Sequence, residues 1–133
     1  MTARLELIPL LGFPLVEPGD DLAQLILAAL RDNDLSLREG DVLVVAQKIV
    51  SKAEDRYVRL ADVKVSPEAL VLAEQAEKDP RQVQLILQES REVLRVRPGV
   101  IIVEHRNGYV HANAGIDKSN IVRTADDPRV LLL

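Results

Sequence analysis

The first thirty residues show two different spacings of apolar side chains. Residues 3–10 place Leu5 and Leu7 between polar and charged neighbours, which is the pattern of a half-buried strand. A loop rich in Gly and Pro follows, and then Asp21 is a candidate N-cap for a run of apolar residues at helical spacing. The pattern therefore predicts a strand, a loop and an amphipathic helix over residues 21–31.

A short apolar run follows a Glu-Gly-Asp turn. Every position of Val42–Ala46 is apolar, and β-branched residues are frequent, which predicts a central strand buried on both faces. Residues 47–52 turn polar where the strand ends, and open α/β sheets commonly place ligand groups there. Lys48 and Lys52 are therefore candidates for neutralising phosphate, although lysines beside a strand also serve solubility or edge protection.

The second half of the chain begins with two helix signals. Ser66-Pro67 and Asp79-Pro80 each combine an N-cap residue with proline at the first helical position. Apolar residues at helical spacing follow each pair. In the second helix the predicted buried stripe consists of Val83, Ile86, Leu87 and Leu94.

A hairpin is predicted next. Arg106-Asn107-Gly108 separates the apolar segments 100–103 and 109–112, and Asn-Gly is the strongest short signal for a hairpin turn. Strands and helices thus occur in separate runs, which is typical of an α+β fold with a mixed sheet. The length of 133 residues fits a single domain over residues 1–133.

Composition excludes several classes of function. The net charge of -4 argues against recognition of a nucleic-acid backbone, and three aromatic residues give no stacking platform for bases. A nucleic acid is therefore not an expected partner. There is no cysteine, so a disulfide framework, a thiolate metal site and a cysteine nucleophile are excluded. No segment has transmembrane length, so a membrane is not an expected partner either, and the cytoplasm is the expected compartment.

The richest candidate chemistry lies in residues 113–120. This segment holds Gly115, the carboxylate of Asp117, the cation of Lys118, and amide or hydroxyl groups at Asn113, Ser119 and Asn120. Such a set suits a hard divalent cation together with nucleotide phosphates. The alternative is a polar loop whose side chains only satisfy nearby backbone groups.

Other candidates are weaker. The loop Gly12–Val16 can approach a ligand through its backbone amides, but a strand-to-helix connection explains its Gly and Pro equally well. His105 and His111 lack a second ligand at helical spacing, so they are expected to be structural rather than zinc ligands. The sequence contains neither a Walker-type Gly-Lys-Ser/Thr loop nor a G-x-G-x-x-G turn, so a nucleotide is expected to bind in another way.

Four segments in order along the chain resemble the coenzyme F-420 γ-glutamyl ligases. They are residues 17–22 (Glu-Pro-Gly-Asp-Asp-Leu), residues 40–54, residues 78–81 (Lys-Asp-Pro-Arg) and residues 113–120 (Asn-Ala-Gly-Ile-Asp-Lys-Ser-Asn). The last segment is the most specific of the four. The match runs in order over nearly the entire chain, which is identified as similar to the amino-terminal half of this family.

The resemblance implies a GTP-dependent ligase that joins L-glutamate through a γ-linkage to coenzyme F-420-0. It implies an acyl-phosphate intermediate, Mg²⁺ or Mn²⁺ as cofactor with K⁺ as a further candidate cation, and a homodimer. Charge on the triphosphate must then be neutralised.

The family's functional positions carry over residue by residue. Asp117 corresponds to a metal ligand, and no catalytic residue is assigned. Phe13, Pro14, Leu15 and Val16 resemble a first nucleotide-binding loop, Gln47 and Lys48 a second contact pair, Lys52 a phosphate-binding lysine, and Asn120 a GTP contact. Some relatives have small hydroxyl residues at the pair, which leaves its detailed contacts open.

Family members continue for about as many residues again, with further metal-binding and nucleotide-binding residues. This chain ends on the apolar run Val130–Leu133, which is expected to be exposed and to need a partner surface. The expectation is therefore a fragment that lacks a complete active site and is inactive alone. Two alternatives stay open: a non-catalytic nucleotide-binding or dimerisation module, and the ligase part of a bifunctional protein with a downstream flavin-reductase-like domain.

Overall fold

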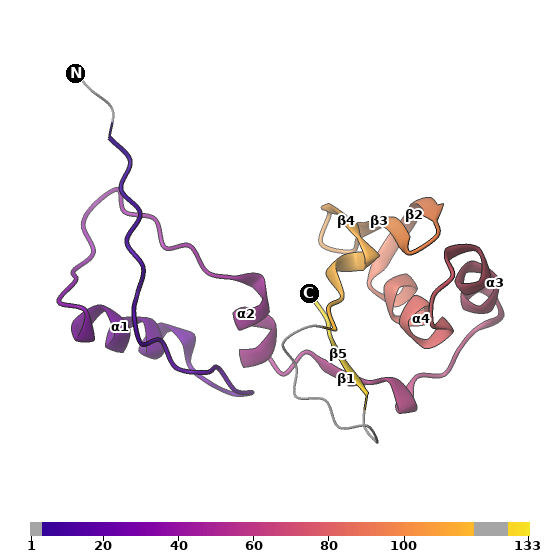
Figure 1. Cartoon of the computed structure of the whole chain (residues 1–133), viewed down its shortest axis with the longest axis horizontal. Coiled ribbons are helices and arrows are strands. Elements are labelled where there is room, and N and C mark those ends of the chain that lie inside the picture. Colours follow the sequence, from indigo (N-terminus) through magenta and orange to yellow (C-terminus); the bar gives the residue numbers. More distant parts are fainter. Residues whose placement is uncertain (1–3, 119–127) are drawn as a thin grey trace. The chain divides into compact units, whose positions relative to one another are not determined.

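A computed structural model of the chain describes residues 4–118 and 128–133 (Figure 1). The chain divides into two compact units, residues 1–55 (unit 1) and residues 56–133 (unit 2). The described residues contain four α-helices and two antiparallel sheets, which confirms the α+β class. The prediction of one domain over residues 1–133 stays a prediction.

Unit 1 contains two helices. Helix α1 spans Leu22–Asp32, and the side chain of Asp21 caps it by accepting a hydrogen bond from the Gln24 N–H at 3.1 Å, which confirms the predicted start. At the other end, the Asn33 side chain exchanges hydrogen bonds of 3.1 and 3.0 Å with the backbone of Leu11. This amide ties the loop before α1 to the end of the helix. Helix α2 spans Gln47–Ala53.

Both strands predicted in this unit are wrong. Residues 4–10 and 42–46 form no strand, and Val42 and Val44 are 81% and 86% exposed rather than buried. A strand needs a neighbour for its backbone N–H and C=O groups, and no described segment pairs with either stretch. Residues 47–52 are consequently the first turns of a helix and not the polar end of a strand.

Unit 2 carries both sheets. Strands β2 (Ser90–Arg97), β3 (Val100–His105) and β4 (Val110–Ala112) form an antiparallel sheet in the order β2-β3-β4. The pairing of β3 with β4 confirms the predicted hairpin. Strands β1 (Tyr57–Arg59) and β5 (Arg129–Leu131) form the second sheet.

Two helices pack in the same unit. Helix α3 spans Pro67–Ala76 and helix α4 spans Pro80–Gln88, and the side chains of Ser66 and Asp79 cap them as predicted. Leu94 does not continue the buried stripe of the second helix: it lies on β2 and is 47% exposed. Helix α4 ends at Gln88, and Leu94 stands at a register shift between Val93 and Arg95, and these neighbours on both sides pair with β3.

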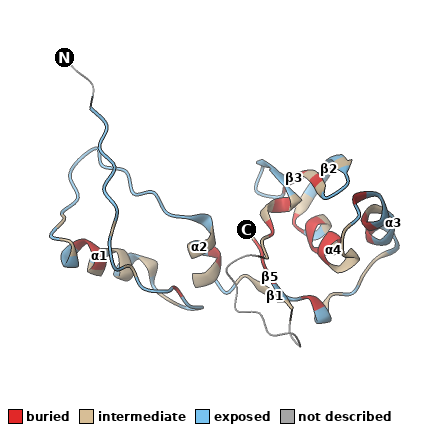
Figure 2. Cartoon of the chain, viewed as in Figure 1, coloured by how far each residue is buried: buried red, intermediate tan, exposed pale blue. Residues whose placement is uncertain are grey.

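The hydrophobic core of the chain lies in unit 2 (Figure 2). It joins the inner faces of α3 and α4 to β3, a 3-10 turn (Leu60–Asp62) and the terminal strand. Its members are Leu60, Ala69, Ala73, Ala76, Val83, Leu85, Ile86, Ile101, Val103, Ala114, Ile116, Val130 and Leu132.

The end of the chain corrects one expectation. Val130 and Leu131 are 0% and 1% exposed, so the terminal apolar run is buried and not exposed. The reason is that β5 pairs with β1, and Leu131 also exchanges two backbone hydrogen bonds with Asp117. Among the described residues, no helix is both long and apolar enough to cross a membrane.

Candidate functional site

The segment Asn113–Lys118 is held in an uncommon backbone conformation. Asn113, Ala114 and Gly115 all have positive φ angles, of 53°, 52° and 70°. Positive φ costs a non-glycine residue about 1–2 kcal/mol, and such strain is found most often at functional sites. Ala114 is fully buried, and the Asn113 carboxamide oxygen accepts a hydrogen bond from the Ile101 N–H at 3.0 Å. The burial of Ala114 and the hydrogen bond between Ile101 and Asn113 therefore hold the bend in place.

The bend delivers Asp117 to a defined place. Its backbone N–H donates to the Leu131 carbonyl at 3.0 Å, and its carbonyl accepts from the Leu131 N–H at 2.9 Å. A terminal strand thus fixes the main chain of the residue assigned to the metal. Asp117 is half-buried. In the described part of the chain no group of three or more His, Cys, Asp or Glu side chains could hold a metal ion.

A second charged segment lies between α3 and α4. The Asp79 carboxylate caps α4 through the Arg81 N–H at 2.9 Å, and it also accepts from the Arg81 guanidinium at 3.0 and 2.7 Å. These hydrogen bonds are the main reason that the pKa of Asp79 lies below its ordinary value. The Lys78 ammonium donates to the Gly99 carbonyl at 2.9 Å.

The charge of Lys118 acts on this second segment. Lys118 lies close enough for its charge to lower the pKa of Lys78, although burial is the larger cause of that shift. The same charge contributes to the lowered pKa of Asp79. Sequence reasoning quoted Lys78–Arg81 for its resemblance and treated Asp79-Pro80 only as a helix start. Three of the four residues Lys78–Arg81 are charged, whereas capping a helix requires only Asp79. The two additional charges are the signal that could have marked this segment.

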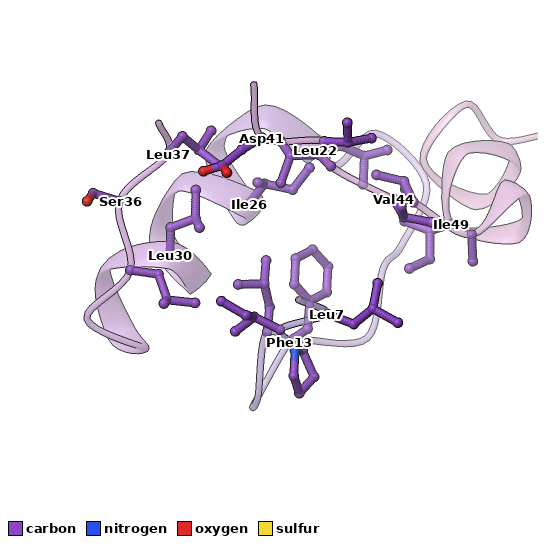
Figure 3. Close-up of a pocket in the computed structure, with 18 of the residues that line it drawn as sticks. Leu7, Phe13, Leu22, Ile26, Leu30, Ser36, Leu37, Asp41, Val44 and Ile49 are labelled. Atoms are coloured by element: carbon purple, nitrogen blue, oxygen red, sulfur yellow. The ribbon is translucent and has the colours of Figure 1, made fainter. Parts of the chain in front are cut away.

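The nucleotide-loop candidates lie in unit 1, beside an apolar pocket of about 600 Å³. Figure 3 shows the Phe13 ring pointing into this pocket toward Ile26 of α1. Val16 is buried, whereas Leu15 is 91% exposed. The pocket lining is mainly apolar and its charged members, Glu6 and Asp41, are both acidic, so this cavity itself does not suit a triphosphate.

The three α2 candidates occupy the start and the last turn of that helix. Gln47 donates a hydrogen bond to the hydroxyl of buried Ser51. Lys48 and Lys52 are both half-buried and stand four residues apart, so they lie on one face of α2. Asn120 lies outside the described residues. The assignments at Phe13–Val16, Gln47, Lys48, Lys52, Asn120 and Asp117 stay predictions.

A buried charged cluster in unit 2 was not predicted. The Glu89 carboxylate, 5% exposed, lies 2.7 Å from the Arg56 guanidinium and 3.1 Å from that of Arg106. The His105 Nε2 atom lies 3.6 Å from the same carboxylate, which is too long for a hydrogen bond. His105 is fully buried and its ring stacks on Tyr109.

Comparison with known proteins extends the picture. A family model described as F420-0:Gamma-glutamyl ligase matches residues 11–133. The chain is 50% identical over 117 residues to the protein named Coenzyme F420:L-glutamate ligase of Methanothermobacter thermautotrophicus, covering 88% of this chain and 46% of that relative. For the protein of the same name from Methanopyrus kandleri, identity is 48% over 119 residues, or 90% of this chain and 44% of the relative.

A third protein of that name, from Archaeoglobus fulgidus, is 43% identical over 118 residues, which is 89% of this chain and 45% of the relative. The chain thus spans about half the length of the curated relatives that it matches.

Proposed function

The chain belongs to the F420-0:gamma-glutamyl ligase family, and we propose that it carries nucleotide-binding and metal-binding residues of a GTP-dependent ligase that joins L-glutamate to coenzyme F-420-0. The observation that carries the proposal is the match over residues 11–133, with 50% identity to a relative named for this ligation. The strained bend that positions Asp117 supports it.

The proposed reaction has two steps. A carboxylate of F-420-0 attacks the γ-phosphorus of GTP, so that an acyl phosphate forms and GDP leaves. The amine of L-glutamate then attacks the acyl carbon: a C–N bond forms, the C–O bond to phosphate breaks, and the nitrogen loses a proton. Both steps move negative charge among phosphate oxygens, so catalysis depends on positive groups that are already in place.

Helix α2 supplies two such groups in the proposal. Lys48 and Lys52 share one helix face, so both ammonium groups can approach one polyphosphate. Two like charges four residues apart destabilise an isolated helix slightly, and a bound anion offsets that cost. Backbone N–H groups of Phe13, Leu15 and Val16 and the side chain of Asn120 complete the proposed GTP contacts, while Pro14, which has no N–H, can only shape the loop.

Asp117 is the proposed metal ligand. Mg²⁺ usually takes one or two carboxylates and fills its other positions with water and phosphate oxygens, so a single carboxylate on a fixed backbone fits Mg²⁺ or Mn²⁺. When bound, the cation would neutralise triphosphate charge. The role of Asp117 is to hold that cation beside the nucleotide.

A binding experiment tests the GTP site. We expect Lys52→Ala to raise the Kd for a fluorescent GTP analogue about tenfold or more, because one charge-assisted hydrogen bond contributes about 1.5–3 kcal/mol. Lys64→Ala is the control, since Lys64 is an exposed lysine of unit 2. Equal affinities of the Lys52 variant and the parent chain would overturn the assignment.

We further propose that the 133-residue chain does not complete the reaction alone, because it spans about half of its relatives. The chain and the full-length Methanothermobacter relative are incubated separately with GTP, Mg²⁺, L-glutamate and F-420-0, and products are measured by mass spectrometry. Product from the relative and GTP binding without product from the chain are expected. Turnover by the chain at ordinary enzyme concentrations contradicts this second proposal.

A further inference from the structure

Strand β5 fixes the main chain of Asp117, although it has only three residues. It pairs with the three residues of β1, and Leu131 exchanges the two backbone hydrogen bonds with Asp117. Burial of Val130 and Leu131 holds the strand on the core. Burial is not directional, however, and the inward face of a strand repeats every second residue, so burial distinguishes poorly between registers two residues apart. A contact that only one register allows would fix Leu131 opposite Asp117.

Arg56, directly before β1, makes contacts of this kind at the end of β5. Its backbone carbonyl accepts a hydrogen bond from the Leu132 N–H at 3.0 Å, and its Nη2 atom donates to the Leu133 carbonyl at 3.2 Å. The same Nη2 atom donates to the Glu89 carboxylate at 2.7 Å. One guanidinium nitrogen thus joins the residues that follow β5 to a carboxylate that belongs to neither strand of the pair.

The Glu89 carboxylate is a fixed anchor for this guanidinium. Glu89 is the C-cap of α4, where its backbone N–H donates to the Leu85 carbonyl at 3.0 Å, and its backbone carbonyl accepts from the Arg106 N–H at 2.9 Å. The Arg106 guanidinium also lies 3.1 Å from the carboxylate oxygen that binds Arg56. Because main chain and side chain of Glu89 are both held, the carboxylate determines where the Arg56 guanidinium stands.

Stability alone explains the second cation poorly. Arg106 already pairs with the Glu89 carboxylate, and the cost of removing water from a buried ion pair offsets much of its attraction. Arg56 adds a fixed place for the end of the chain. Leu133, which accepts from Arg56, also lies against the bend before Asp117, because a Cβ added at Gly115 would stand 2.8 Å from Leu133 Cδ1.

We propose that Arg56, held by Glu89, is a positioning residue that sets the register of β5 and thereby the place of the Asp117 carboxylate. This inference rests on the proposed function, which assigns Asp117 to the divalent cation. A shift of β5 by one residue moves the partner of Asp117 by about 3.3 Å, which exceeds a Mg²⁺–oxygen bond of about 2.1 Å. Arg56 and Glu89 touch neither cation nor nucleotide and act through the backbone.

Hydrogen exchange of the 133-residue chain, followed by NMR, tests the positioning role. The amides of Asp117 and Leu131 form the bridge, so their exchange reports local opening of β5. We expect Arg56→Met to speed exchange at both amides about tenfold, the effect of losing one charge-assisted hydrogen bond. Amides in the middle of α4 should keep their rates, because Arg106 still pairs with Glu89 and the core is unchanged.

Two further variants and a matched control separate position from general stability. Arg56→Lys keeps a cation that can donate to the Glu89 carboxylate and the Leu133 carbonyl, so it should restore part of the protection. Glu89→Gln removes the charge of the anchor at nearly unchanged shape and should speed exchange at the same two amides. Arg91→Met breaks the exposed Arg91–Glu104 pair of 3.3 Å in the same unit and should leave both rates unchanged.

A Mn²⁺ titration of the same chains measures the consequence for the proposed metal site. Bound Mn²⁺ broadens NMR signals near it, and we expect this broadening at Asp117 in the parent chain. Arg56→Met should raise the Mn²⁺ Kd about tenfold, as loss of an outer contact that orients a metal ligand does elsewhere. Arg91→Met should leave the Kd unchanged.

Three outcomes would overturn the positioning role. They are unchanged exchange at Asp117 and Leu131 in both Arg56→Met and Glu89→Gln, an equal acceleration of exchange in α4, and an unchanged Mn²⁺ Kd despite faster exchange at the bridge. Faster exchange in the variants, together with no Mn²⁺ broadening at Asp117 in the parent chain, would instead refute the metal assignment of the proposed function and leave the effect of Arg56 on β5 standing.

Discussion

Unit 1 and unit 2 use their apolar residues in opposite ways. Unit 2 buries them in one core against two sheets. In the described part of unit 1 the buried apolar residues are Val16, Ala29 and Leu30, whereas Leu5 and Val44 are 85% and 86% exposed (Figure 2). Both units contain apolar runs that suit strands, but in the described residues only those of unit 2 have a neighbouring strand to pair with.

The difference teaches that helices and strands depend on the rest of the molecule to different degrees. Helix α1 satisfies most of its backbone groups within itself and has caps at Asp21 and Asn33, so its hydrogen bonds need no neighbouring strand. An extended segment has unpaired N–H and C=O groups on both edges and acquires strand structure only beside a neighbour. Residues 42–46 have the composition of a strand and lack that neighbour among the described residues.

The largest expected effect comes from removing the same side chain in each unit. Leu85 lies in α4 and is 4% exposed, while Leu27 lies in α1 and is 45% exposed. We expect Leu85→Ala to lower the free energy of unfolding by about 2–5 kcal/mol, because it removes buried area and leaves a cavity. Leu27→Ala should cost about 1 kcal/mol or less.

Urea unfolding measures both variants. Tyr57 and Tyr109 are both in unit 2, so tyrosine fluorescence follows that unit, and far-UV circular dichroism follows the whole chain. Because both substitutions replace leucine by alanine within a helix, helix propensity cancels in the comparison. Equal losses in the two variants would mean that the core is not confined to unit 2.

Two glycines, one in each unit, have nearly the same φ angle, so the same substitution can be compared at both positions. Gly12 and Gly115 have φ angles of 71° and 70°, but an added Cβ meets nothing within 4 Å at Gly12 and lies 2.8 Å from Leu133 Cδ1 at Gly115. Gly12→Ala should therefore cost about 1 kcal/mol for its positive φ alone. Gly115→Ala should cost about 2–3 kcal/mol, because crowding adds to the same penalty.

A double variant tests why Gly115→Ala should lose more stability than Gly12→Ala. Leu133→Ala removes the side chain that a new Cβ would meet, so the double variant with Gly115→Ala should lose less than the sum of the two single changes. The four chains are compared by their urea midpoints. Additive losses would show that backbone strain alone explains the requirement for glycine, and that Leu133 does not pack against the bend.

Local features of the fold could be predicted from the sequence, because their causes lie within a few residues. Asp21, Ser66 and Asp79 cap the helices that they were predicted to cap, and Asn107-Gly108 turns the predicted hairpin. The pairing of β1 with β5 could not be predicted, since it joins segments about seventy residues apart in sequence and reverses the expected exposure of the chain's end.

In the candidate site, too, some features could be predicted from the sequence and others could not. The side-chain types of residues 113–118 made them candidates for metal and phosphate binding, because carboxylate, amide and cation stand within a few positions, and this assignment stays a prediction. The strain at Ala114 could not be predicted, since alanine carries no signal for a positive φ angle. Nor could the effect of the Lys118 charge on the pKa of Lys78, because these two residues are far apart in sequence.

The smallest expected effect is a pH dependence confined to unit 2. The Asn107 N–H donates to His105 Nδ1 at 3.1 Å, so the ring is neutral with its proton on Nε2. Burial lowers the pKa of His105 from its ordinary value of 6.5, and Glu89 opposes this only in part. The unfolded chain therefore binds a proton more readily than the folded one.

Stability is consequently complete above about pH 6.5 and falls as the pH drops toward the folded pKa of His105, by at most about 1.4 kcal/mol per pH unit for one proton. Thermal unfolding followed by tyrosine fluorescence between about pH 7.5 and 5.5 measures this slope. His105→Phe should abolish the slope, whereas His111→Ala, at an exposed position, should keep it. A slope that survives in His105→Phe would place the titrating group elsewhere, and a slope of opposite sign would mean that Glu89 stabilises the charged ring more than burial penalises it.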